Sequence, residues 1–371
     1  MSDPLYITRP VLPDVSELVP YLERIWSSGI VTNAGPFHQE LERALGEHLR
    51  APCVMLFNNG TIALLVALKM MNLKLGSEVI TTPLTFAATA HSISWNGLTP
   101  VFADVDPDTL TIDPAAIEKA ITPKTSAILA VHVYGTVCDV SALQDVANRH
   151  GLRLIYDAAH VFGATIDGAP IGIFGDASVF SFHATKLFNT LEGGAITSPR
   201  AEDQDKIYYL RNFGIKNEEE IVDIGINGKM NEVQAAIGIL NLTKIESERQ
   251  FRRGLREKYN DLFYNLQGVR LPLTQKGVLN SEQYYHLVID PKYFGRNRDV
   301  MYQELKQKNI FARKYFHPIC TDFEPYKNNV IHSLRSTPYV EDVKSRVLCL
   351  PFHSGVTDEH IQSIHETFRT P

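Results

Sequence analysis

The stretch Ser181-Phe182-His183-Ala184-Thr185-Lys186-Leu187-Phe188-Asn189-Thr190-Leu191-Glu192-Gly193-Gly194 lies between two apolar runs. Residues 177–180 before it and 195–197 after it each predict a buried strand. The stretch itself is rich in small and polar residues, which predicts a loop that presents Lys186 at the edge of a sheet. A lysine after an apolar strand is most often a solvated surface residue, so Lys186 becomes a functional candidate only through its context.

Upstream of this loop, short apolar runs alternate with runs of helical periodicity. Strands are predicted at residues 53–57, 78–82, 100–105, 127–133 and 152–157, with helices at 62–68, 87–95, from 113, and 140–150. Two amphipathic helices precede them, the first capped by Asp14 and stopped by Gly29. Near-continuous apolar strands that alternate with helices predict an α/β fold with a mainly parallel sheet covered on both faces.

The pattern changes beyond about Asn231. One long helix is predicted over residues 232–265, followed by a strand at 284–289, a helix at 298–308 and a last helix from 358. We therefore expect two domains: a large one over residues 1–245, with the N-terminal helices included, and a small C-terminal α+β domain over residues 246–371.

Composition excludes several classes of protein. The 371 residues are 44% hydrophobic with a formal net charge of -6, and acids and bases are interspersed, which argues against binding to nucleic acid or anionic membranes. Four scattered cysteines without a Cys-x-x-Cys pair predict free thiols in a reducing compartment and no metal site. The N-terminus lacks the pattern of a signal peptide, and no apolar run approaches the roughly 20 residues that cross a bilayer. We expect a cytoplasmic protein.

An aspartate stands at the end of another predicted strand, Leu154-Ile155-Tyr156-Asp157. The non-functional interpretation of Asp157 is that it caps a helix. A lysine and an aspartate at two strand ends, however, suit pyridoxal phosphate (PLP), which needs an amine to hold its aldehyde and an acid to keep its ring nitrogen protonated. His160 lies close enough in sequence to donate to the phenolic oxygen of the cofactor, although a core histidine is nearly as good an interpretation.

Other segments carry groups that suit the rest of such a cofactor. Asn59-Gly60-Thr61 at a predicted helix start offers backbone N–H groups to a phosphate, and Ser181 adds a hydroxyl. Phe86 is a candidate to stack on the ring, with a core aromatic as the alternative. Arg313-Lys314-Tyr315-Phe316-His317-Pro318 suits an anionic or sugar ligand, or else forms a surface turn.

Together these segments resemble the DegT/StrS family of sugar aminotransferases, which have the aspartate-aminotransferase fold. The resemblance spans nearly the whole chain. Its motifs are Thr32-Asn33-Ala34-Gly35-Pro36, Asn59-Gly60-Thr61, Pro83-Leu84-Thr85-Phe86-Ala87-Ala88-Thr89-Ala90, Asp157-Ala158-Ala159-His160, the stretch around Lys186 with Glu192-Gly193-Gly194, the block from Asn227 to Ala236, and Leu350-Pro351.

The resemblance implies a fold type I PLP-dependent transferase in which Lys186 forms the covalent bond to the cofactor and Asp157 pairs with its ring nitrogen. It further assigns cofactor contacts to Gly60, Thr61, Phe86, Ser181 and, in a homodimer with active sites at the interface, the partner subunit's Asn227. His183, Arg313, Tyr315 and His317 are the candidate substrate-binding residues.

The segments after Lys186 and from Arg313 to Pro318 are most similar to enzymes that act on dTDP-4-keto-6-deoxyglucose or its 3-keto isomer. The resemblance favours the 4-keto sugar, with glutamate as amino donor and dTDP-4-amino-4,6-dideoxyglucose as product, in deoxysugar or O-antigen biosynthesis. Some relatives are dehydratases with histidine in place of this lysine, so Lys186 favours amino transfer. A PLP-dependent dehydratase and a catalytically silent sensor of PLP or a nucleotide sugar are the alternatives.

Overall fold

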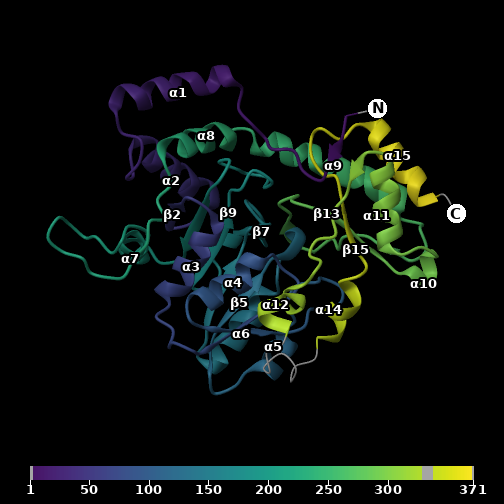
Figure 1. Cartoon of the computed structure of the whole chain (residues 1–371), viewed down its shortest axis with the longest axis horizontal. Helices are drawn as coiled ribbons and strands as arrows, with labels where there is room; N and C mark the ends of the chain where they lie inside the picture. Colours follow the sequence, from purple (N-terminus) through teal and green to yellow (C-terminus); the bar gives the residue numbers. More distant parts are fainter. Residues whose placement is uncertain (1–2, 328–336, 370–371) are drawn as a thin grey trace.

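The computed structural model describes residues 3–327 and 337–369, and its centre is a seven-stranded mixed sheet (Figure 1). The strand order is β2 (Cys53–Phe57), β10 (Gly194–Ser198), β9 (Ala177–Ser181), β6 (Arg153–Asp157), β5 (Thr125–Val131), β3 (Glu78–Thr81) and β4 (Thr99–Phe102). All neighbours pair in parallel except β10, which is antiparallel to both β2 and β9. The expected α/β class with a mainly parallel sheet is confirmed.

Both faces of this sheet are buried because successive strand residues point to opposite sides. In β2, Val54 and Leu56 belong to one hydrophobic cluster, and Met55 and Phe57 belong to the other. The first cluster is closed by α2 (Pro36–Leu49), α5 (Pro114–Ala120), α6 (Val140–His150) and α8 (Glu232–Leu242). The second is closed by α3 (Gly60–Met70), α4 (Ala87–Trp95) and α7 (Asp203–Arg211).

Several helices begin at residues whose side chains accept backbone hydrogen bonds. Asn59 caps α3 through the Ile62 N–H, Asp113 caps α5, and Asn231 caps α8 through the Gln234 N–H. The predicted end of α1 (Val15–Ser28) is also confirmed, since Gly29 follows it with a φ of 69°. These local signals fix where these helices start or end.

The segment after α8 builds a separate small sheet. It contains β11 (Val269–Arg270), β13 (Tyr285–Ile289) and β15 (Val347–Leu350), all antiparallel. α9 (Ile245–Phe263), α11 (Arg298–Gln307) and α15 (Asp358–Arg369) supply side chains to a further hydrophobic cluster around this sheet. A domain boundary at residue 245 stays a prediction.

The prediction of one continuous helix over residues 232–265 was wrong. α8 ends at Leu242 and α9 begins at Ile245. The Thr243 hydroxyl donates to the Leu240 carbonyl, and the Lys244 N–H donates to the Asn241 carbonyl three residues back, which interrupts the helical hydrogen-bond ladder. The apolar periodicity runs through this break, which is why periodicity alone did not reveal it.

The other strands and α-helices are short. They are β1 (Leu5–Tyr6), which pairs with β14 (Ile310–Phe311), the sheet of β12 (Val278–Leu279), β7 (Thr165–Ile166) and β8 (Ala169–Pro170), and the helices α10 (Pro291–Phe294), α12 (Glu324–Lys327) and α14 (Pro338–Val343). Within the described part of the chain, none of the helices combines the length and the apolar character that a bilayer crossing requires.

Candidate active site

A cavity of about 650 Å³ opens where β6 and β9 end. Asp157 is the last residue of β6, Ser181 is the last residue of β9, and Lys186 follows in the loop that joins β9 to β10; all three line the cavity. Ligands of α/β proteins bind at this edge of the sheet because loops and helix N-termini converge there. Two sequence motifs that lie about 30 residues apart therefore meet in one place.

Lys186 and Asp157 both line the cavity, and the charge of each acts on the pKa of the other. Burial lowers the pKa of Lys186 to about 8, although the Asp157 charge acts in the opposite direction. Burial also raises the pKa of Asp157, against the hydrogen bonds that favour its charged form. These bonds come from the Thr89 hydroxyl to Oδ2 at 2.8 Å and from the Ala159 N–H to Oδ1 at 3.1 Å. A lysine with this pKa is about one-tenth free amine at pH 7, far more than an ordinary lysine, so it can act as a nucleophile or a base.

His160 is held in one tautomer. Its Nδ1 accepts the Tyr134 N–H at 3.2 Å, so the hydrogen of the neutral ring sits on Nε2. Burial lowers the pKa of His160 well below its usual value, and the Lys186 charge acts in the same direction, which keeps the ring neutral. The ring stacks on Phe316 with centroids 5.6 Å apart and lines the cavity. His160 is thus a hydrogen-bond donor to an oxygen bound there.

The N-terminus of α3 forms the anion-binding part of the cavity. Gly60 and Thr61 are the first helical residues, whose N–H groups have no partner within a helix. A Cβ on Gly60 would lie 2.9 Å from the Ser181 Cβ, so only glycine allows the helix to approach the end of β9 this closely. Backbone donors and the Ser181 hydroxyl therefore converge, as a phosphate requires.

The outer wall of the cavity is polar and more exposed. The His183 Nδ1 lies 2.8 Å from the Thr185 hydroxyl, and its Nε2 lies 3.6 Å from a Glu192 oxygen. Arg313, Tyr315 and Phe86 also line this wall, and Phe86 is 62% exposed. This wall offers an arginine, a histidine and aromatic faces to a ligand that is both anionic and polar.

Two of the predicted site residues do not line this cavity. His317 is exposed on the turn before Pro318. Asn227 is exposed on the loop between α7 and α8, which extends away from the sheet (Figure 1). All the other predicted residues lie in the cavity.

Sequence reasoning gave no role to several residues that complete the cavity. Thr89 binds Asp157 directly, and Thr85 lies 2.8 Å from the Thr89 hydroxyl. Tyr284 faces Lys186, with Nζ 5.8 Å from the ring centroid, and its ring meets His160 edge to face. Thr85 lies two residues before α4 and Thr89 lies in its first turn, so their four-residue spacing could have indicated the first pair. No local signal in the sequence indicated Tyr284.

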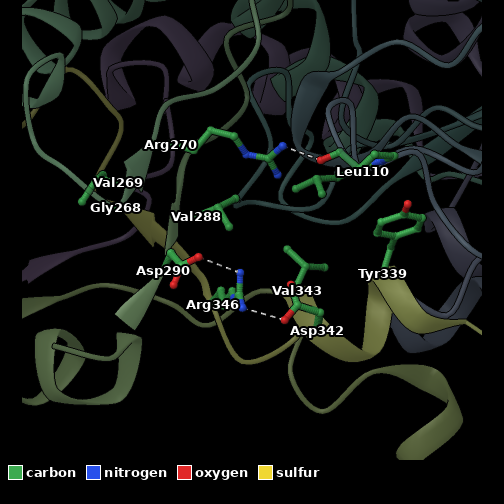
Figure 2. A pocket seen from close by; sticks show the side chains of 11 residues that line it. Leu110, Gly268, Val269, Arg270, Val288, Asp290, Tyr339, Asp342, Val343 and Arg346 are labelled. Carbon is green, nitrogen blue, oxygen red and sulfur yellow. Dashed lines mark hydrogen bonds and ion pairs between the residues drawn. The ribbon is translucent and has the colours of Figure 1, made fainter. Parts of the chain in front are cut away.

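A second cavity, of about 460 Å³, lies between the loop at Pro107 and Leu110 and the C-terminal sheet (Figure 2). Arg346 is paired there with Asp290 at 3.3 Å and with Asp342 at 2.7 Å, and Arg270 donates to the Pro107 carbonyl. The described residues that line it include no lysine, histidine or cysteine. The cavity at Lys186 is therefore the candidate for catalysis.

Comparison with known proteins assigns the family. The sequence profile of the DegT/DnrJ/EryC1/StrS aminotransferase family matches residues 14–369. The chain belongs to this family. A member from Shigella dysenteriae, a dTDP-4-amino-4,6-dideoxy-D-glucose transaminase, is 43% identical over 369 residues, which cover 100% of this chain and 99% of the relative.

Solved structures of DegT/DnrJ/EryC1/StrS aminotransferases share the fold. DesI, solved in the presence of its TDP-sugar product, matches with a TM-score of 0.93 and 37% identity over 100% of this chain and 93% of its own. The PLP form of the putative sugar aminotransferase Spr1654 from Streptococcus pneumoniae matches with a TM-score of 0.90 and 27% identity, over 99% and 98% of the two chains. The predicted fold type and the aminotransferase class are confirmed.

Proposed function

We propose that this aminotransferase uses PLP to convert dTDP-4-keto-6-deoxyglucose into dTDP-4-amino-4,6-dideoxyglucose, with glutamate as the amino donor. The observation that carries the proposal is the meeting of half-buried Lys186 and buried Asp157 beside the N-terminus of α3 in one cavity. The choice of sugar is supported by the name of the Shigella relative, which matches over the full length of the chain.

The residues present fit the cofactor. A buried carboxylate such as Asp157 needs a cationic partner to remain charged, and the pyridinium nitrogen is one. The α3 N-terminus and Ser181 suit the phosphate, His160 Nε2 suits the phenolic oxygen, and the exposed ring of Phe86 at the cavity suits a stacking contact. When bound, PLP supplies an aldehyde and an electron-withdrawing ring.

Lys186 does two things in this proposal. Its amine would hold the cofactor when PLP is bound, and as a base it would move the proton of the donor α-carbon. A pKa of about 8 lets the same amine accept this proton and later return it during transfer to the sugar. Because one lysine serves both half-reactions, the donor product leaves before the sugar reacts, and we expect ping-pong kinetics.

The substrate is proposed to bind at the outer wall. Arg313 suits the diphosphate of the nucleotide sugar, and Tyr315 and His183 suit the sugar, since they lie at the open side of the same cavity. His317 is exposed and does not line the cavity of the single chain, so its proposed contact with the substrate would require a different position of this turn.

We also propose a cytoplasmic homodimer in which the partner subunit's Asn227 reaches the phosphate. The loop that carries Asn227 exposes the apolar side chains of Ile221 (70%) and Ile224 (82%). Helix α1 exposes Trp26 (70%). Exposed apolar groups gathered on projecting segments favour burial against a second copy of the chain.

One experiment tests the substrate assignment. The purified enzyme is incubated with glutamate and, separately, with 4-keto and 3-keto dTDP-6-deoxysugars, and the products are identified by NMR and mass. We expect an amine at carbon 4 from the 4-keto sugar. Amination of only the 3-keto sugar would favour the alternative aminotransferase, and loss of oxygen without gain of nitrogen would favour the dehydratase.

A further inference from the structure

Tyr134 touches both walls of the cavity without lining it. It lies just after β5 and is buried, with 2% of its surface exposed. Its backbone N–H donates to Nδ1 of His160, and its hydroxyl donates to the Tyr315 carbonyl at 2.6 Å. Tyr134 therefore forms one hydrogen bond to the inner wall, through its backbone, and one to the outer wall, through its hydroxyl.

The backbone of Tyr134 is held in an uncommon conformation. Its φ of 59° and ψ of 0° lie in the left-handed region, which a bulky residue rarely occupies. Such a conformation is strained and persists only where surrounding contacts determine it. The following Gly135 is fixed as well, because the Asn280 amide donates to its carbonyl at 3.2 Å. The turn is thus tightly held on both sides.

The ring of Tyr134 adds to the connection. It stacks on Phe316 with centroids 5.7 Å apart, and on His286 of β13 with centroids 4.6 Å apart. Phe316 in turn stacks on His160. Since burial raises the pKa of Tyr134 well above 10, the hydroxyl keeps its hydrogen and remains a donor over the whole working pH range.

We propose that Tyr134 is a positioning residue that latches the segment Arg313–Phe316 at the distance from His160 that the nucleotide sugar requires. The proposal rests on the proposed function, because it assumes that this segment binds the sugar substrate. Glutamate is a much smaller ligand than a nucleotide sugar and depends less on the outer wall. Loss of the latch should therefore affect the sugar half-reaction and spare the donor half-reaction.

Tyr134→Phe removes the hydroxyl and keeps the ring and the backbone N–H. The matched control is Tyr259→Phe, since the Tyr259 hydroxyl also donates to a backbone carbonyl, that of Pro351, at 2.9 Å, in the buried C-terminal cluster. The two half-reactions are measured separately by stopped-flow absorbance on the holoenzyme. Hydrogen exchange of the peptide that contains residues 313–316 reports on the segment directly.

We expect Tyr134→Phe to lower kcat/KM for the sugar half-reaction roughly 3- to 10-fold, mainly through KM, the range expected for one lost hydrogen bond. The donor half-reaction should stay within about twofold, and exchange at residues 313–316 should increase. Tyr259→Phe should change neither. A general loss of stability would slow both half-reactions together and would overturn the proposal, as would an unchanged sugar half-reaction. Failure of the wild-type enzyme to aminate a sugar would instead count against the proposed function.

Discussion

The two walls of the active-site cavity are built differently. The inner wall consists of strand ends and their immediate continuations, and Asp157 and His160 on it are 6% and 4% exposed. The outer wall is drawn from segments far apart in the chain, and Phe86 on it is 62% exposed. Burial shifts the pKa values of Lys186, Asp157 and His160 on the inner wall. The groups that we propose for the chemistry therefore lie on the buried inner wall, and those that we propose for substrate binding lie on the exposed outer wall.

The inner wall should tolerate change least. Lys186→Ala removes the amine that we propose to hold the cofactor and to move the proton, and we expect turnover to fall by about 10³-fold or more. Borohydride reduction followed by mass spectrometry should attach the cofactor to the peptide that contains residue 186 in the wild type only. Lys119→Ala, an exposed lysine on α5, serves as the control and should keep full activity. Substantial activity without Lys186 would remove the inner wall from the chemistry.

Asp157→Asn tests the charge of the inner wall while keeping its shape. The amide retains an oxygen for the Thr89 hydroxyl but cannot balance a protonated ring nitrogen. We expect PLP to bind and the rate of amino transfer to fall by about 10²-fold, a smaller loss than that of Lys186→Ala. Absorbance titration measures binding, and single-turnover kinetics measure transfer. An unchanged rate would mean that Asp157 only supports the loop after β6.

The sequence predicted residues of the inner wall better than residues that are placed by tertiary packing. Asp157, Ser181 and Lys186 stand at or just after apolar strands, so periodicity was sufficient to place them at one edge of the sheet. Tyr284 and Tyr134 reach the site only through tertiary packing between β13, the turn after β5 and the segment at 313–316, which leaves no local pattern. Asn227 lies outside the cavity of a single chain, so only the family resemblance gave it a role.

The fold shows a similar limit. Helix caps at Asp113 and Asn231 were predictable because they depend on a side chain three residues or fewer from its partner. The break between α8 and α9 could not be predicted in this way, because the apolar spacing continues across Thr243. The contact of the Thr243 hydroxyl with the Leu240 carbonyl can also form inside a continuous helix, so a threonine there does not indicate a break.

Burial lowers the pKa of Lys186, so a measurement of this pKa tests whether the inner wall is shielded from water. Only the neutral amine can attack an aldehyde, and its fraction rises with pH up to the pKa. We expect the rate of PLP capture by the cofactor-free enzyme to rise about tenfold per pH unit and to level off above about pH 8, rather than near 10.5. Stopped-flow absorbance between pH 6 and 10 measures it. A rise that continues to pH 10 would show that the lysine is solvated, and the contrast between the two walls would disappear.

The smallest expected effect concerns a residue behind the inner wall. Thr89→Val removes the hydroxyl that donates to Asp157 at 2.8 Å while keeping the branched shape of the side chain. That bond lowers the pKa of Asp157, so its loss should raise the pKa and make activity fail at a higher pH on the acid side of the profile. We expect kcat/KM at neutral pH to fall roughly 3- to 10-fold, as for one charge-assisted hydrogen bond. Thr197→Val is the matched control, because the Thr197 hydroxyl is equally buried but donates to the Gly172 carbonyl, away from the cavity. If both variants kept the wild-type pH profile, the bound cofactor rather than the Thr89 hydroxyl would set the ionisation of Asp157. Thr89 would then have no part in the chemistry of the inner wall.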